Sequence, residues 1–192
     1  HNSKEKISKQ LGDGNLLSQL TRHTVVFDFR QNDLKNGGEG APLTPIFHKL
    51  ITNKKKIKSP VCILNIGGIA NVTLIEKKDK NSFISKDLGP GNCLIDEWIR
   101  NNTKKKYDEN GEIAKQGMVD ELILNQALDN FDNRPNQNIS SFDTSDFSLG
   151  FVRGLSFEDG TATLTEFTAR LIGSGLENFL SNSKDKLLKV LV

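Results

Sequence analysis

Two short segments that contain glycine carry the residues best suited to chemistry. The first, LNIGGIAN, places Gly67 and Gly68 directly after an apolar run and ends on Asn71. A tight glycine turn exposes backbone N–H groups with no Cβ in the way, and such groups bind phosphate oxygens. The alternative is an ordinary β-hairpin, in which the glycines only supply a positive φ angle.

The second segment, KDLGPGN, has Asp87 at the end of a strand-like run, and a Gly-Pro-Gly turn then leads into a helix. Ligands of α/β proteins bind beyond the carboxyl ends of strands. The Asp87 carboxylate is therefore expected in a cleft, beside a helix N-terminus. The alternative is an aspartate that only stabilises the turn or caps the helix, although Gly91 or Asn92 can cap that helix without it.

A third segment joins DFRQND to the glycine loop GGEGAPL. Arg30 can bind a carboxylate through two parallel hydrogen bonds. Gly38 and Gly40, on either side of Glu39, can let a ligand approach the backbone closely. The alternative is a structural Asp–Arg pair next to a flexible loop, and alone this segment predicts little.

Histidines and cysteines are not expected to react. No triad pattern accompanies His23 or His48, so both are interpreted as structural or surface residues. A helix N-terminus can lower the pKa of a thiol such as that of Cys93, but a small buried residue is the favoured interpretation. Cys62 and Cys93 show no metal-ligand spacing, so no metal site is expected.

Composition excludes several classes of protein. The chain of 192 residues has 26 Lys+Arg against 24 Asp+Glu, a formal net charge of +2, and one Trp and one Tyr. Nucleic acid is therefore not expected as a partner. No apolar run approaches the ~18 residues of a membrane span, and the opening residues HNSKEKISKQ lack the apolar core of a signal peptide. Because two cysteines make no disulfide framework, a reducing cytoplasm is expected.

Hydrophobic periodicity predicts alternating blocks of strands and helices. Strands are expected at 24–29, 60–65, 70–76, 82–86 and 187–192. Helices are expected at 11–20, 44–51, directly after 91, at 119–128 and at 156–179, with 130–148 as a loop. Ser156 with Asp159 resembles a capping box. Three strands followed by helices and a further strand predict a mixed sheet flanked by helices, as in the ribonuclease-H-like half of an actin- or sugar-kinase-type domain.

The polar stretch at 52–59 predicts a domain boundary. Residues 1–58 are expected to be the C-terminal part of a first lobe. Residues 59–192 are expected to form a second, ribonuclease-H-like lobe that is truncated at its C-terminal end. The chain closes on a strand-like run and opens without one, so the sequence is expected to be a fragment.

Together and in this order, the segments resemble the anhydro-N-acetylmuramic acid kinase family. The resemblance rests on VVFDFRQNDLKNGGEGAPLTPIFH, LNIGGIANVTLI, DLGPGNCLIDEWI, YDENGEIAKQG and EDGTATLTEFTA, which run through most of the chain. It implies an α/β, two-lobed fold of the actin, hexokinase and Hsp70 superfamily. It also implies an enzyme of cell-wall recycling that depends on ATP and Mg2+. Such an enzyme hydrolytically opens the 1,6-anhydro ring and phosphorylates O6, giving N-acetylmuramic acid 6-phosphate.

The resemblance also implies roles for single residues. Asp87 matches the family's catalytic aspartate, and Gly67 and Gly68 match its second phosphate-binding hairpin, with Asn71 as a further nucleotide contact. The residues expected to contact the sugar are Arg30, Gly38, Glu39, Gly40 and Asn92. The implied partners are a small amino sugar and ATP, and a homodimer is left open.

Some features depart from the family pattern. The first phosphate loop and the adenosine segment are missing, Glu39 stands where the family usually has Gln, and a Lys-Ser…Arg block is degraded at 140–144. The fragment alone is therefore expected to be inactive. Two alternatives stay open: a non-catalytic sugar- or nucleotide-binding remnant of the same fold, and a phosphate-hydrolysing relative.

Overall fold

A computed structural model describes residues 5–38, 40–76, 83–134, 141–181 and 189–192. The chain forms two compact units, residues 1–47 and 48–192. Helix α3 (Pro45–Lys54) begins after Thr44, as expected, and runs across the division between the units. It also occupies the first residues of the linker expected at 52–59. The assignment of residues 1–58 and 59–192 to two lobes stays a prediction.

Helix α1 (Gly14–Thr21) is the first helix of residues 1–47. The Asp13 carboxylate caps it by accepting hydrogen bonds from the backbone N–H groups of Asn15 and Leu16, at 2.9 and 3.1 Å. A cap of this kind satisfies N–H groups that the first helical turn leaves unpaired. The helix expected at 11–20 is therefore present but begins later.

The prediction of a strand at 24–29 is wrong. Residues 24–28 form no strand, and α2 (Phe29–Lys35) begins where the strand was expected to end. The physical reason is Asp28, whose φ of 64° is left-handed and turns the extended chain into the helix. β-Branched and aromatic residues favour strands only where a neighbouring strand covers them.

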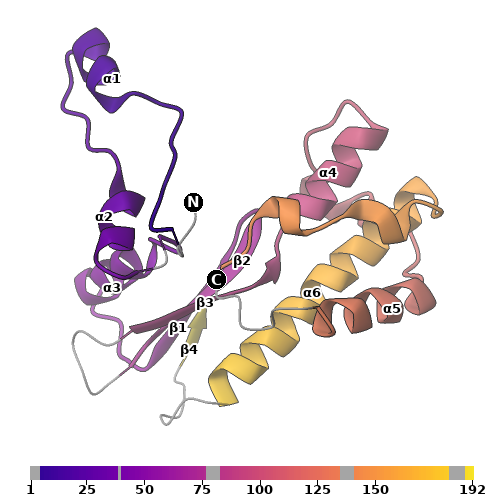
Figure 1. Ribbon diagram of the computed structural model, residues 1–192. Helices are drawn as coiled ribbons and strands as arrows, with labels where there is room; N and C mark the ends of the chain where they lie inside the picture. The colour runs from indigo at the N-terminus through magenta and orange to yellow at the C-terminus, as the bar shows by residue number, and fades with distance from the viewer. Residues whose placement is uncertain (1–4, 39, 77–82, 135–140, 182–188) are drawn as a thin grey trace. The chain divides into compact units, whose positions relative to one another are not determined.

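A four-stranded mixed sheet forms the centre of residues 48–192, in the order β3-β2-β1-β4 (Figure 1). The strands are β1 (Val61–Ile66), β2 (Ile69–Ile75), β3 (Phe83–Pro90) and β4 (Lys189–Leu191). β2 is antiparallel to β1 and to β3, whereas β4 is parallel to β1. The predicted mixed α/β architecture is thus confirmed. β3 is longer than the strand expected at 82–86, because it continues through Asp87.

One face of the sheet is apolar and packs on α6 (Phe157–Ser181). Its buried residues are Cys62, Leu64, Ala70, Val72, Leu74 and Leu88, and Ile172 of α6 packs on them. Alternation along each strand sends every second side chain to the other face. The opposite face is therefore available for polar residues.

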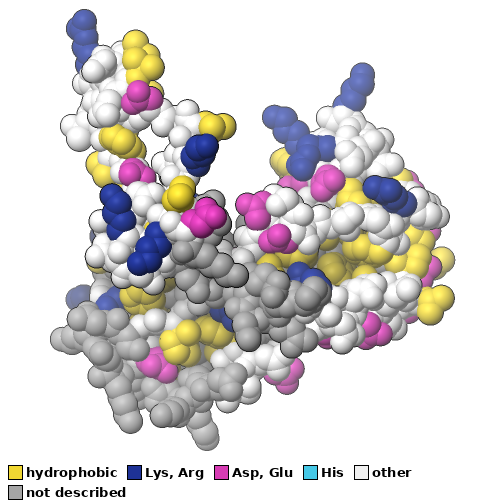
Figure 2. All heavy atoms as spheres, viewed as in Figure 1, with side chains coloured by type: hydrophobic (Ala, Val, Ile, Leu, Met, Phe, Trp, Pro, Cys, Tyr) yellow, Lys and Arg dark blue, Asp and Glu magenta, His cyan; other side chains and the backbone are white. Residues whose placement is uncertain are grey.

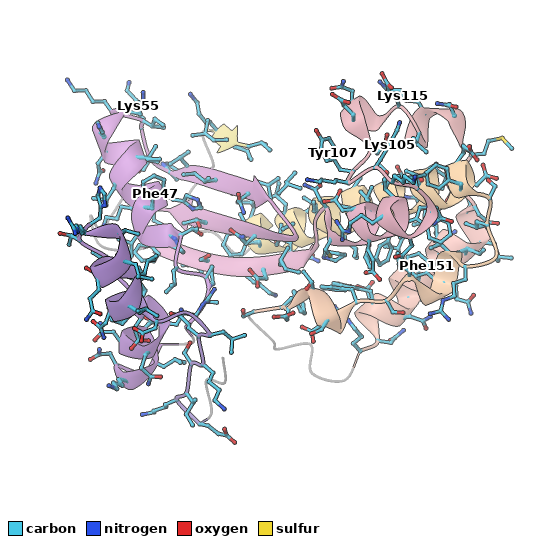
Figure 3. The ribbon with its side chains drawn as sticks, turned by 90° about the horizontal axis from the view of Figure 1, so that it is seen from above. Phe47, Lys55, Lys105, Tyr107, Lys115 and Phe151 are labelled. Atoms are coloured by element: carbon cyan, nitrogen blue, oxygen red, sulfur yellow. The ribbon has the colours of Figure 1, made fainter. Side chains whose placement is uncertain are left out.

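The other helices make a second core with α6. α4 (Cys93–Asn102) and α5 (Glu121–Asp132) contribute Leu94 and Leu124, which meet Leu164 and Phe167 of α6. Partly buried apolar residues surround this core, and Figure 2 shows a band of hydrophobic side chains on the surface of this helical part. Phe151, labelled in Figure 3, lies among the helices with its ring 5.1 Å from that of Phe167.

Connections complete this unit. Within the described residues, short 3-10 helices lie at Glu109–Gly111, Ala114–Gln116, Thr144–Asp146 and Leu149–Val152. α5 runs beyond the expected 119–128 into the region interpreted as a loop. α6 and β4 confirm the helix expected at 156–179 and the last strand, although 182–188 lie outside the described residues. In the described part of the chain, no helix is both long and apolar enough to cross a bilayer.

The start of α6 shows half of the capping box expected there. The Ser156 hydroxyl accepts a hydrogen bond from the Asp159 N–H at 3.1 Å. The Asp159 carboxylate accepts instead from the Met118 N–H at 2.7 Å. The EDGTATLTEFTA block therefore ties the connection before α5 to the beginning of α6.

Replacement of Leu124 by Ala tests the helical core. Leu124 is 0 % exposed, so Leu124→Ala leaves a cavity and lowers the free energy of unfolding by about 2–5 kcal/mol. Leu122 lies on the same helix and is 81 % exposed, so Leu122→Ala changes that free energy by less than about 0.5 kcal/mol. Urea unfolding followed by circular dichroism measures both, and equal losses would contradict the described packing.

Candidate active site

Three polar side chains form a row across the sheet, on the face away from α6. Asn65 of β1 is paired with Asn71 of β2, and Asn71 is paired with Asp87 of β3. Paired residues of neighbouring strands project to the same face, with Cβ atoms about 4.5–5.5 Å apart. This polar row brings two of the predicted site residues, Asn71 and Asp87, next to each other.

Asp87 is buried, with 6 % of its surface exposed, and its Oδ2 accepts a hydrogen bond from the Phe142 N–H at 2.8 Å. It lies inside β3 and not at its end, because the strand continues to Pro90. The register shifts at this point: Ala70 pairs with Gly89 and Asn71 with Asp87, so β3 bulges by one residue. A bulge re-aims side chains, and a backbone donor to a carboxylate fixes its orientation.

Asn71 has a buried amide oxygen that no described group satisfies. A buried polar atom without a partner costs about 1–3 kcal/mol. A proton donor from a ligand or water would remove this cost. The polar row therefore contains an acceptor next to the Asp87 carboxylate that is suited to binding.

The glycine hairpin is confirmed, because β1 and β2 are antiparallel and close on the pair of Ile66 with Ala70. The positive φ angle expected at these glycines is wrong, since neither Gly67 nor Gly68 has one. A Cβ built on Gly68 would have ordinary contacts, 3.7 Å from Thr144 Cγ2 and 4.0 Å from Cys93 Cβ. The fold itself thus tolerates a side chain there, which favours a glycine kept open for a ligand.

Hydrogen bonds clamp the hairpin to the turn that follows β3. The Gly67 carbonyl accepts from the Asn92 N–H at 2.7 Å, and the Gly68 carbonyl accepts from the Gly91 N–H at 2.9 Å. A Cβ on Gly91 would collide with the Gly67 oxygen, so only glycine fits there. Asn92 holds the N-cap position of α4 without a side-chain cap, and its amide lies 3.5 Å from the Ile66 carbonyl. Hairpin and turn therefore form one rigid piece.

The loop at 141–146 lies over this piece. Besides the bond from Phe142 to Asp87, it places Thr144 beside Gly68. Asp143 and Asp146 form a capping box within it. Hydrogen bonds from Ser145 lower the pKa of the Asp143 carboxyl group. The loop is thus ordered by its own bonds. Ser140, the first residue of the block expected to be degraded, lies outside the described residues.

The predicted sugar-contact residues of residues 1–47 form a separate group. The Arg30 Nη1 atom donates to the Gly40 carbonyl at 2.6 Å, and the Gly40 N–H donates to Asp33 Oδ2 at 2.8 Å. The backbone N–H of Gly38 donates to the Asp33 carbonyl at 2.9 Å. Arg30 and Asp33 therefore hold the glycine loop from two sides, and Glu39 lies outside the described residues.

His48 and Cys93 lie in partly buried positions whose contacts are those of structural residues. The Nδ1 atom of His48 is 2.9 Å from Thr73 Oγ1, and burial lowers the pKa of its imidazole. Burial also raises the pKa of the Cys93 thiol and outweighs the backbone N–H groups near it. Among the described residues, no group of three or more His, Cys, Asp or Glu side chains is placed to hold a metal ion.

Sequence reasoning missed two groups that hold predicted site residues. Within residues 1–47, the Asp33 carboxylate accepts a hydrogen bond from the Gly40 N–H, and the DFRQND motif alone predicts no such role for it. The Phe142 N–H on Asp87 is a backbone group from a segment 55 residues away. No residue type signals such a donor, so only the tertiary fold reveals it.

The four-stranded mixed sheet flanked by helices is consistent with the fold of sugar kinases of the actin and hexokinase type. The chain belongs to the anhydro-N-acetylmuramic acid kinase family, whose model matches residues 1–190.

Curated relatives named anhydro-N-acetylmuramic acid kinase agree with this membership. One from Pelagibacter ubique is 55% identical over 192 residues, which is 100% of this chain and 51% of the relative. One from Zymomonas mobilis is 44% identical over 88% of this chain and 46% of its own length. One from Methylobacterium nodulans is 41% identical over 92% and 46%. The chain therefore spans about half the length of these relatives.

Replacing Gly91 and Gly68 by alanine separates a glycine that the fold needs from one that it does not. Gly91→Ala forces the new Cβ against the Gly67 carbonyl, so the free energy of unfolding falls by about 1–3 kcal/mol. Gly68→Ala meets only ordinary contacts and leaves that free energy unchanged or slightly higher. Denaturant unfolding measures both free energies. A Gly68→Ala protein as unstable as Gly91→Ala would contradict the conclusion that the fold needs glycine at position 91 but not at position 68.

Proposed function

We propose that the protein is an ATP-dependent kinase that hydrolytically opens the 1,6-anhydro ring of anhydro-N-acetylmuramic acid and phosphorylates O6. The observation that carries this proposal is the Asp87 carboxylate, oriented by the Phe142 N–H and clamped next to an open glycine hairpin. A base beside a phosphate-binding turn is what this coupled reaction requires. The names of the relatives support the kinase part of this proposal, with anhydro-N-acetylmuramic acid as the substrate.

Asp87 acts as the general base. A free aspartate has a pKa of ~3.9, so it is a weak base for bulk water and is effective only when proton removal accompanies bond cleavage. Asp87 would accept a proton from a water molecule as the water oxygen attacks C1.

One carboxylate suffices because of the leaving group. An inverting glycosidase normally needs a second carboxylic acid to protonate the departing oxygen. Here the C1–O bond breaks and leaves its electron pair on O6, which attacks the γ-phosphorus of ATP. O6 thus forms a bond to phosphorus instead of hydrogen, and ADP departs.

The glycine hairpin contributes positioning and electrostatics. Backbone N–H groups at Gly67 and Gly68 would bind phosphate oxygens of ATP, with Asn71 as the neighbouring nucleotide contact; such groups stabilise charge that develops during transfer. Magnesium would supply further neutralisation of the phosphates; it is usually held by substrate phosphates and one or two protein oxygens. The unpartnered Asn71 Oδ1 is an oxygen donor of the type that it accepts.

Arg30, Gly38, Glu39, Gly40 and Asn92 are proposed to contact the sugar. In this proposal residues 1–58 and 59–192 belong to the two lobes of the kinase, and the 192-residue chain alone is inactive. Because ATP is the phosphoryl donor, the reaction is assigned to the cytoplasm.

Whether the full-length protein forms a homodimer is tested by gel filtration, which measures its size in solution.

Replacement of Asp87 by Asn tests the base directly. Asp87→Asn keeps the shape of the side chain but removes its basicity, so kcat of the full-length protein falls by about 10²–10⁴. The matched control is Asp129→Asn, at an exposed position of α5, for which kcat is unchanged. A coupled ADP assay with the anhydro sugar as substrate measures both.

Near-normal turnover by Asp87→Asn would remove Asp87 from the mechanism. A wild-type protein that binds the sugar in calorimetry but never consumes ATP would favour the non-catalytic remnant. Release of phosphate from ATP without any phosphorylated sugar would favour the phosphate-hydrolysing relative.

The hairpin is tested by a larger side chain at Gly68. Gly68→Val adds a branched side chain at an exposed backbone position that a phosphate would have to approach. The KM for ATP is expected to rise by 10-fold or more, about 1.4 kcal/mol of binding, while the KM for the sugar changes little. Initial rates measure both constants, and an unchanged KM for ATP would leave the hairpin without a nucleotide role.

A further inference from the structure

Arg134, just after α5, lies in a cluster of three phenylalanines. Its guanidinium carbon is 3.4 Å from the ring centroid of Phe131, 5.0 Å from that of Phe142 and 5.7 Å from that of Phe147. The rings also contact one another, with centroids 5.5–6.3 Å apart. We call these four residues the arginine–phenylalanine cluster.

The interaction in this cluster is a cation–π contact. A guanidinium within about 6 Å of an aromatic centroid is attracted by the ring quadrupole, more strongly where water is excluded. Burial lowers the pKa of Arg134, and the carboxylates of Asp146 and Asp132 act in the opposite direction. Its Nε donates to the Phe131 carbonyl at 2.9 Å, which fixes the plane of the guanidinium.

One side of the cluster belongs to the rigid part of the unit. Phe131 is on α5, and its ring is 6.3 Å from that of Phe167 on α6. The same ring faces Gly89 on β3, because a Cβ built on Gly89 would lie 3.4 Å from it. The other side is the loop. Phe142 and Phe147 bracket residues 143–146, and the Phe142 N–H donates to Asp87.

The loop at 141–146 is closed by hydrogen bonds within itself, whereas fewer contacts fix its position on the sheet. The capping box of Asp143 and Asp146 closes the turn internally. Placement against Asp87 and Gly68 depends on Phe142 and on Thr144. The Arg134 guanidinium contacts the rings of Phe142 and Phe147 together with that of Phe131, so it links the two ends of residues 142–147 to α5.

We propose that Arg134 is a positioning residue of the active site: its cation–π contacts hold the loop at 141–146 so that the Phe142 N–H fixes the Asp87 carboxylate. This role rests on the proposed function of Asp87. Arg134 itself touches neither substrate, and it acts only through Phe142. Lysine cannot replace it fully, because an ammonium lacks the flat guanidinium that stacks on a ring.

Hydrogen exchange at single amides tests the proposal in the full-length protein. Arg134→Met keeps an apolar stem and removes the cation, and Arg134→Lys keeps the cation and removes the plane. Arg170→Met is the matched control, since Arg170 is on the exposed side of α6 and pairs with Glu121 and Glu166. The expected result is exchange of the Phe142 amide about 10-fold faster in Arg134→Met, a smaller increase in Arg134→Lys, and no change in Arg170→Met.

Turnover of the same variants completes the test. In Arg134→Met, kcat is expected to fall by about 10-fold or more, because misplacement of a catalytic group is costly, while the KM for ATP is retained. Unchanged exchange at Phe142 would overturn the proposal. Faster exchange spread equally over β2 and α6 amides would also overturn it, because it would show a merely structural role.

The two proposals fail in different ways. Normal kcat in Arg134→Met, with local loosening at Phe142, refutes the positioning role even where Asp87→Asn is inactive. Normal kcat in Asp87→Asn refutes the proposed function, whatever happens at Phe142.

Discussion

Three hydrogen bonds to the carbonyls of the glycine hairpin hold the candidate site in one piece. The Gly67 oxygen accepts from the Asn92 N–H, and the Gly68 oxygen accepts from the N–H groups of Gly91 and Cys93. These bonds fix the turn after β3 to the turn after β1, and thereby fix the Asp87 carboxylate relative to the glycines. A reaction that couples attack at C1 with phosphoryl transfer to O6 needs this fixed geometry, because catalysis of phosphoryl transfer is mainly positioning and electrostatics.

The sheet face that holds the candidate site is polar, and the sequence shows the reason only partly. Alternation along β1, β2 and β3 sends Leu64, Val72 and Leu88 towards α6, and it leaves Asn65, Asn71 and Asp87 on the other face. The bulge at Leu88 lets Asp87 stay in register with Asn71 while Leu88 remains in the core. Polar residues in a strand are costly to bury, so a row that includes an unpartnered amide oxygen is typical of a binding site.

Much of the fold could be predicted from local patterns, because the mixed sheet and α6 have clear periodicity. The strand expected at 24–29 failed, since β-branched and aromatic residues form a strand only with a partner, and Asp28 turns the chain. Asp87, Gly67 and Gly68 could be selected from residue type and spacing. The Phe142 N–H and the cluster around Arg134 could not, because a backbone donor and a ring-on-guanidinium contact depend on segments that are distant in sequence.

In the proposed mechanism one carboxylate suffices because ring opening and phosphorylation of O6 are a single event. Single-turnover rapid quench of the full-length protein can count the C1 hydroxyl groups and the ADP molecules formed at each time. A single event gives a ratio of one from the earliest time onward, with no unphosphorylated ring-opened sugar. Ring-opened sugar that accumulates before ADP would contradict it, because a second acid would then have to protonate the departing oxygen.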